Sequence, residues 1–127
     1  MNLACGTDII EISRVKDSIS NDLGDKFLER VYTNKEIDYC ESKKSQKYQH
    51  YAARFAAKEA VFKAISKKLD NKFDIEWKQI EVLNNESGRP YVVVNNSVNS
   101  KIDCIDLSMS HCKEYACANA IVVFKGE

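Results

Sequence analysis

The first half of the chain begins with a short strand pattern and continues with apolar residues at helical spacing. Residues 4–12 are rich in β-branched side chains and predict an opening strand, although this strand carries Asp8 in its interior. Ser13 is then a candidate N-cap for a short helix that ends near residue 21. A second short helix is expected over residues 25–31. An acidic residue inside a strand needs a partner or a solvent-facing position, so Asp8 is the first candidate for function.

The next segments predict a capped helix, a polar connection and a long helix. Thr33 and Glu36 have capping-box spacing, which predicts a helix that runs to about Ser42. Residues 41–47 are polar and predict a loop or a lid with a solvated charged face. Residues 48–68 predict the longest helix, because alanines recur through it and have strong helix propensity. Their small side chains allow this helix to lie close against a sheet.

Beyond residue 70 the pattern changes to the period of two that marks strands. Apolar residues alternate with polar ones, and turn-forming residues separate them. Strands are predicted around 80–82, 91–94, 105–110 and 116–124, with a hairpin connection over 84–90. Helices in the first half and strands in the second predict an α+β fold. We expect one domain, residues 1–127, in which an antiparallel sheet packs against the long Ala-rich helix.

Composition narrows the class of protein. Of the 127 residues, 44% are hydrophobic and 30% charged, with 19 basic and 19 acidic residues. This balance argues against a general nucleic-acid binder, and no apolar run approaches the roughly 18 residues of a membrane span. The five cysteines are odd in number and form no C-x-x-C pair, so we expect free thiols in a reducing cytoplasm. The sequence therefore predicts a cytoplasmic protein without nucleic-acid or membrane partners.

Two interpretations are open for the polar residues of the long helix. Glu59 and Lys63 are four residues apart and lie on one helix face, where a simple ion pair contributes about 0.3–0.5 kcal/mol. Alternatively, Asp8 supplies a second carboxylate, and the two acids hold Mg²⁺ while Lys63 meets a phosphate. His111 and the Gly88–Pro90 turn are, taken singly, ordinary surface features.

Four segments in order carry a more specific signal. GTDIIEI at 6–12, RFAAKEAVFKAI at 54–65, SGRP at 87–90 and SMSHCKEYACA at 108–118 resemble the stand-alone holo-[acyl-carrier-protein] synthases. These are small members of the 4′-phosphopantetheinyl transferase superfamily, and the resemblance covers essentially the whole chain. It implies the fold of that family, a homotrimer, and an enzyme of fatty acid biosynthesis. In the implied reaction, coenzyme A (CoA) gives its 4′-phosphopantetheine group to a serine of apo acyl carrier protein and releases adenosine 3′,5′-bisphosphate.

The resemblance also implies roles for individual residues. Asp8 and Glu59 would ligate Mg²⁺, or Mn²⁺, next to the CoA pyrophosphate, and Lys63 would neutralise its charge. Arg54 and His111 would meet the 3′-phosphate of CoA. Either Glu59 or a metal-bound water could accept the serine proton, and the sequence leaves both open.

Other residues would meet CoA and the carrier protein. The resemblance implies that Gly88, Arg89 and Pro90 border the adenine across a subunit interface. Acyl carrier proteins are acidic, so basic residues would form the docking face, with an aromatic among them. The expected docking residues are Arg14, Lys26, Phe27 and Arg30.

One departure and two alternatives accompany this assignment. The family usually has a glycine-rich stretch after the long helix, whereas residues 66–70 contain no glycine. A binding module that recognises CoA or an acidic partner without turnover would keep Arg14 but tolerate loss of Asp8. A transferase for a specialised carrier of secondary metabolism would differ only in its partner.

Overall fold

The computed structural model describes residues 1–126. The helices are α1 (Ile12–Ser20), α2 (Gly24–Val31), α3 (Asn34–Glu41) and α4 (Lys47–Ile65). The strands are β1 (Asn2–Glu11), β2 (Ile80–Asn84), β3 (Pro90–Val94), β4 (Ile102–His111) and β5 (Tyr115–Phe124). Short 3-10 turns are η1 (Lys44–Gln46), η2 (Ser66–Lys68), η3 (Lys72–Asp74), η4 (Trp77–Gln79) and η5 (Ser97–Lys101). The expected α+β class and long helix are confirmed.

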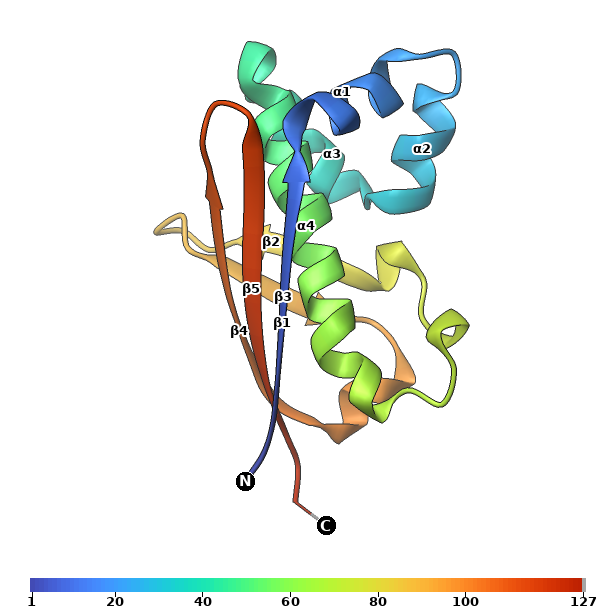
Figure 1. Ribbon diagram of the computed structural model, residues 1–127, viewed down its shortest axis with the longest axis vertical. Coiled ribbons are helices and arrows are strands. Elements are labelled where there is room, and N and C mark those ends of the chain that lie inside the picture. The colour runs from blue at the N-terminus through green and yellow to red at the C-terminus, as the bar shows by residue number, and fades with distance from the viewer. Residues whose placement is uncertain (127) are drawn as a thin grey trace.

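The strands form two antiparallel sheets, where the sequence led us to expect one. The larger sheet has the order β1-β5-β4, and β2 pairs only with β3. η5 connects β3 to β4, and β4 pairs with β5 rather than with β3. Figure 1 shows α4 running along the large sheet, with α1, α2 and α3 gathered at the end where β1 passes into α1. Residues from both sheets and from α4 share one hydrophobic core.

The close packing of α4 on β1 depends on small residues. A Cβ added to Gly6 would lie 1.9 Å from the carbonyl oxygen of Ala60, so no other residue fits there without separating the two elements. Ala56, Ala57 and Ala60 are fully buried beneath the sheet. The prediction that alanines let this helix approach a sheet closely is confirmed. This contact brings the middle of β1 next to the second half of α4.

Several boundaries differ from the expectation for a local reason. Ser13 is not an N-cap: α1 begins at Ile12, and the N-cap residue Glu11 makes no side-chain cap bond. The Ile12 amide instead donates to the Glu114 carbonyl oxygen at 2.8 Å, so a hairpin carbonyl replaces the expected cap. The capping box of Thr33 and Glu36 is confirmed.

The ends of the long helix and the polar connection also differ from the expectation. The segment over 41–47 contains η1 rather than an open loop, and α4 ends at Ile65, where η2 follows it.

No helix within residues 1–126 is long and apolar enough to cross a membrane. The hairpin connection over 84–90 is confirmed by the pairing of β2 with β3, and Gly88 at its tip has a φ of 90°.

Candidate functional site

Asp8 and Lys63 meet where β1 packs on α4. The Lys63 Nζ lies 3.2 Å from the Asp8 carboxylate and donates to the Thr7 carbonyl oxygen at 2.9 Å. The Asp8 side chain is 18% exposed and the Lys63 side chain 50% exposed. Within residues 1–126, Lys63 pairs with Asp8 and makes no ion pair with Glu59. The simple helical pair that the sequence allowed is therefore replaced by a link between two elements.

Glu59 is half-buried beside these two groups. Burial raises the pKa of the Glu59 carboxyl above its usual value, the nearby Asp8 carboxylate raises it further, and Lys63 opposes them. Two carboxylates share one partly exposed ammonium here, so negative charge is only partly compensated. Such a site favours an additional cation.

A cavity of about 320 Å³ joins this cluster to the expected docking residues. Asp8 and Glu59 line it together with Arg14 of α1 and Phe27 of α2. The Phe27 ring stacks on Phe55 of α4 with the ring centroids 6.3 Å apart, which makes one wall of the cavity apolar. The structure thus brings the two expected metal ligands and two of the expected docking residues, Arg14 and Phe27, to one cavity.

The donor set fits a hard divalent cation only in part. Within residues 1–126 no group of three or more His, Cys, Asp or Glu side chains could enclose a metal ion. Mg²⁺ usually keeps several waters and takes one or two carboxylates plus substrate phosphates. Asp8 and Glu59 offer that minimal set of oxygen ligands. The pKa of Glu59 is raised mainly by burial and further by the Asp8 carboxylate, and a bound cation would oppose both effects.

Arg54 lies in a second cavity, of about 530 Å³, which also borders Gly88. Its side chain is 2% exposed, donates to the Asn84 side chain, and lies over the Tyr39 ring at 4.1 Å. Within residues 1–126 its guanidinium has no carboxylate partner, and its Nε makes no hydrogen bond. Buried charges are normally paired, so this uncompensated cation indicates a site for an anion.

Sequence reasoning missed two residues near Arg54. Lys43 lines the same cavity, with its Nζ 4.7 Å from the Tyr39 ring centroid, although we expected only a solvated face there. The His50 ring lies 6.2 Å from the exposed His111 ring. Burial lowers the pKa of His50, and the charges of Lys43 and Arg54 lower it further. The sequence gives no local signal for either residue, because Lys43 and His50 come near Arg54 only through the fold.

The remaining predicted residues lie at two other places. Arg89 pairs with Asp106 at 2.9 Å, and with Pro90 it lines a cavity of about 320 Å³ on β4 and β5. Lys26 and Arg30 of α2 line a cavity of about 630 Å³. Within one chain, therefore, Arg54 and Gly88 share a cavity, whereas Arg89 and Pro90 face a different one.

Comparison with known proteins decides the family. The family model described as the 4′-phosphopantetheinyl transferase superfamily matches residues 4–120. The chain is 45% identical over 127 residues to the holo-[acyl-carrier-protein] synthase of Ruminiclostridium cellulolyticum, covering 96% of this chain and 92% of that protein. The chain belongs to this superfamily, among its holo-[acyl-carrier-protein] synthases.

Solved structures agree with this assignment. The holo-[acyl-carrier-protein] synthase of Helicobacter pylori, in complex with coenzyme A, has a TM-score of 0.81 and 26% identity. That likeness covers 94% of this chain and 99% of the other. The synthase of Bacillus anthracis, in complex with CoA (3′,5′-ADP), has a TM-score of 0.74 and 32% identity, over 94% of each chain. The fold of this chain is therefore that of the synthase family.

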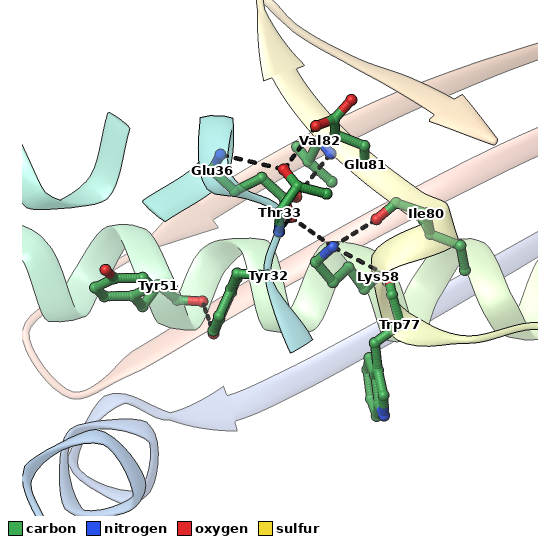
Figure 2. A network of polar contacts seen from close by, with 9 residues as sticks. All are labelled: Tyr32, Thr33, Glu36, Tyr51, Lys58, Trp77, Ile80, Glu81 and Val82. Carbon is green, nitrogen blue, oxygen red and sulfur yellow. Dashed lines mark hydrogen bonds and ion pairs between the residues drawn. The ribbon is translucent and has the colours of Figure 1, made fainter. Parts of the chain in front are cut away.

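A buried polar network centres on Lys58 of α4 (Figure 2). Lys58 precedes Glu59 on α4, and its Nζ lies 2.7 Å from the Glu36 carboxylate, with both side chains fully buried. The same Nζ donates to the carbonyl oxygens of Ile80 at 2.6 Å and Trp77 at 3.2 Å. The Glu36 carboxylate also accepts from the backbone amides of Thr33 at 2.9 Å and Val82 at 2.8 Å.

This network ties three elements of the fold together. It joins the start of α3, the middle of α4 and the start of β2. Desolvation lowers the pKa of Lys58, and the Glu36 carboxylate opposes that shift. The short distance and the full set of acceptors support an ionised pair despite burial. The sequence reasoning recognised Glu36 only as a capping residue and gave Lys58 no role.

Proposed function

We propose that this protein transfers the 4′-phosphopantetheine group from CoA to a serine of apo acyl carrier protein and releases adenosine 3′,5′-bisphosphate. The single observation that carries the proposal is the cavity in which Asp8, Glu59, Arg14 and Phe27 meet. Two carboxylates that can hold a metal, one basic side chain and an aromatic wall therefore line one space. The biological role is the supply of holo carrier protein for fatty acid biosynthesis.

Asp8 and Glu59 are the proposed ligands of Mg²⁺, with Mn²⁺ as a substitute that also accepts oxygen ligands. When bound, the metal neutralises charge on the CoA pyrophosphate and polarises the phosphate that is attacked. Lys63 remains half exposed beside Asp8, so its ammonium can turn from the carboxylate to a phosphate oxygen.

The serine hydroxyl attacks the phosphorus that bears the pantetheine arm. The bond from this phosphorus to the oxygen of the adenosine phosphate breaks, and adenosine 3′,5′-bisphosphate leaves with that oxygen. The serine proton passes to Glu59 or to a nearby water. Burial already raises the pKa of Glu59 towards the range that suits a general base, and the choice between the two acceptors stays open.

The adenosine end of CoA carries the remaining charge, and we propose that Arg54 and His111 bind its 3′-phosphate. Arg54 is buried without an anionic partner among residues 1–126, and the basic residues Lys43 and His50 lie near it. The Gly88–Pro90 turn borders the adenine. Gly88 shares the cavity of Arg54, which is the support for its part in this arrangement.

The carrier protein is proposed to dock on α1 and α2. Arg14 and Phe27 line the cavity with the acids, and Lys26 and Arg30 lie on the adjoining surface of α2. An acidic partner would be attracted by these basic side chains, and the attraction would weaken as salt concentration rises.

A homotrimer is proposed because the large sheet has one uncovered apolar face. Leu3 is 51% exposed, Ile9 67% and Ile121 50% on that face. Arg89 and Pro90 border the same face, so a second copy seated there would meet the Gly88–Pro90 turn. Light scattering after size-exclusion chromatography should give three times the chain mass, and Ile121→Lys should lower it. A monomeric wild-type protein would contradict the proposal.

We further propose that residues 1–127 form a single catalytic domain that acts in the cytoplasm. The family match to residues 4–120 supports the first part. Five free thiols support the second, because such thiols suit a reducing compartment.

Intact-mass spectrometry of an apo carrier protein tests the transfer itself. Incubation with CoA and Mg²⁺ should add the mass of one phosphopantetheine group, and a chelator should prevent it. Asp8→Ala and Glu59→Ala should abolish the gain in mass while the circular dichroism spectrum stays unchanged. No gain with a carrier that a known synthase modifies would contradict the proposal and favour a binding module without turnover.

A further inference from the structure

The ring of Tyr39 has two cations over it, and both line the cavity around Arg54. The Arg54 guanidinium lies 4.1 Å from the ring centroid, and the Lys43 Nζ lies 4.7 Å from it. Tyr39 belongs to α3 and Arg54 to α4, whereas Lys43 follows α3, so the ring connects two helices. The function proposed above uses Arg54 and gives Tyr39 no role.

The other contact of the Arg54 guanidinium is also with a neutral group. One terminal nitrogen donates to the side-chain oxygen of Asn84, and the Nε makes no hydrogen bond within residues 1–126. The Asn84 amide nitrogen donates in turn to the Gly88 carbonyl oxygen at 2.9 Å, which ties this contact to the turn between β2 and β3. Buried charges are normally paired with an opposite charge, but here a ring and an amide hold the cation.

Carboxylates leave both cations without an ion pair. Of the residues among 1–126 that line the cavity, one carries a carboxylate, Glu86, and it is exposed and pairs with neither Arg54 nor Lys43. A carboxylate in the place of the ring would neutralise the guanidinium. An aromatic face attracts a cation through its quadrupole and has no net charge. The ring therefore holds Arg54 and leaves its positive charge for a ligand.

We propose that Tyr39 is a positioning residue that supports selectivity for the 3′-phosphate of CoA over dephospho-CoA. The inference rests on the proposed function, in which Arg54 meets that phosphate. The ring holds the guanidinium in place before the ligand arrives, so less side-chain ordering has to occur on binding. Dephospho-CoA lacks the 3′-phosphate and gains nothing from a guanidinium that is held in this way.

The ring face of Tyr39 has this role, and the phenol hydroxyl does not. The side-chain contacts of Tyr39 described within residues 1–126 are contacts of the ring. Lys43 and Arg54 lie over it, and the His50 ring meets it edge-on with the centroids 5.7 Å apart. Tyr39→Phe keeps all of these contacts, whereas Tyr39→Leu keeps an apolar side chain and removes the π face.

Calorimetric titration with CoA and with dephospho-CoA, both in the presence of Mg²⁺, tests the proposal. The wild-type protein should bind CoA more tightly than dephospho-CoA. Tyr39→Leu should raise the dissociation constant for CoA about five- to tenfold, because one or two long side chains must then be ordered on binding. Its dissociation constant for dephospho-CoA should stay within about twofold of the wild type. Tyr39→Phe should resemble the wild type with both ligands.

Tyr39→Glu separates positioning from packing. Its carboxylate would pair with Arg54 and Lys43, so its unfolding midpoint should be no lower than that of Tyr39→Leu. Its dissociation constant for CoA should nevertheless rise further than that of Tyr39→Leu, because the guanidinium is then neutralised. A purely structural role predicts the opposite order, in which the more stable of the two variants binds CoA more tightly.

Tyr48→Leu is the matched control. The Nζ atoms of Lys16 and Lys47 lie over the Tyr48 ring, 5.5 and 5.3 Å from its centroid, and Tyr48 does not line the cavity of Arg54. This variant also loses a ring that has two cations over it. It should change neither dissociation constant, whatever its effect on the unfolding midpoint.

Contrary results have separate meanings. An equal rise for both ligands in Tyr39→Leu would overturn the proposal, because the effect would then lie away from the 3′-phosphate. An unchanged preference for CoA in Tyr39→Leu, or an equal loss in Tyr39→Phe, would overturn it as well. Failure of the proposed function is visible in the wild type, which would then bind neither ligand or bind both equally, with no selectivity for Tyr39 to support.

Discussion

Two lysines of α4 form ion pairs in opposite surroundings. Lys58 and Glu36 are fully buried and 2.7 Å apart, and backbone groups satisfy the remaining donors and acceptors around them. Lys63 and Asp8 are 3.2 Å apart, with the lysine side chain half exposed. Two lysines five residues apart on one helix are therefore in different environments, one fully buried and one half exposed.

The difference is physical. A buried pair cannot exchange its partner for water, so removal of one member leaves a charge without compensation. A partly exposed pair contributes little to stability, because water and salt screen it and either group can take another partner. We infer that the Glu36–Lys58 pair fixes the position of α4 and that the Asp8–Lys63 pair remains available for ligands.

The largest effect should come from Lys58→Met. The substitution leaves the Glu36 carboxylate buried without its cation, and the free energy of unfolding should fall by about 3–5 kcal/mol. Urea denaturation measures this directly. The double variant Glu36→Gln with Lys58→Met should recover part of the loss, because the glutamine still accepts a backbone N–H. A loss for Lys58→Met below about 1 kcal/mol would show that the buried pair does not fix α4.

Asp8→Asn should separate activity from stability. Loss of one carboxylate charge weakens the proposed metal site, so kcat should fall by about 10²- to 10³-fold. The free energy of unfolding should change by less than about 1 kcal/mol, because the pair is partly exposed. Steady-state kinetics and urea denaturation on the same preparation check both values. A stability loss comparable to that of Lys58→Met would assign Asp8 a structural role.

The pH dependence of stability should report on Glu59. Its pKa is raised in the folded protein, mainly by burial, so the folded state holds this proton more tightly than the unfolded chain does. The associated stability is present below the ordinary glutamate pKa and is lost as pH rises through the raised value. Because the group is about half exposed, the loss should be under about 1 kcal/mol after screening. Unfolding midpoints across this window should show the loss in the wild type.

Glu59→Gln is the control for that measurement, since it has no proton to lose. Its midpoint should be flat over the same window. Mg²⁺ should flatten the wild-type curve, because a bound cation favours the ionised carboxylate. A wild-type curve without slope in the absence of metal would contradict the raised pKa.

Lys63→Ala should have the smallest effect on stability. Loss of the exposed pair should change the free energy of unfolding by about 0.5 kcal/mol or less. The dissociation constant for CoA should nevertheless rise, because a cation beside the pyrophosphate is missing. Calorimetric titration with CoA checks this. Unchanged affinity, with the metal present, would leave Lys63 with a role towards Asp8 alone.

Much of the fold follows from patterns that are local in sequence. The alternation in the last strands, the alanines of α4 and the capping box of Thr33 each predict an element that the structure contains. The start of α1 was not predictable in this way, because the Ile12 amide is satisfied by the Glu114 carbonyl, which is far away in the sequence. The split into two sheets likewise depends on which strands meet, and alternation does not specify that.

For the candidate site too, some features follow from the sequence and others depend on the tertiary structure. The order of the G-x-D, KEA and SGRP segments determines the family and hence the residue types of the site. Only the tertiary structure decides that Lys63 turns to Asp8 rather than to Glu59, since both acids are within reach of the lysine and the packing of β1 on α4 selects one. It also decides that Lys58 is buried, because the β2 backbone and Glu36 close over the helix there. Sequence spacing fixes which face of a helix a charge occupies, whereas burial and partner depend on distant segments that cover that face.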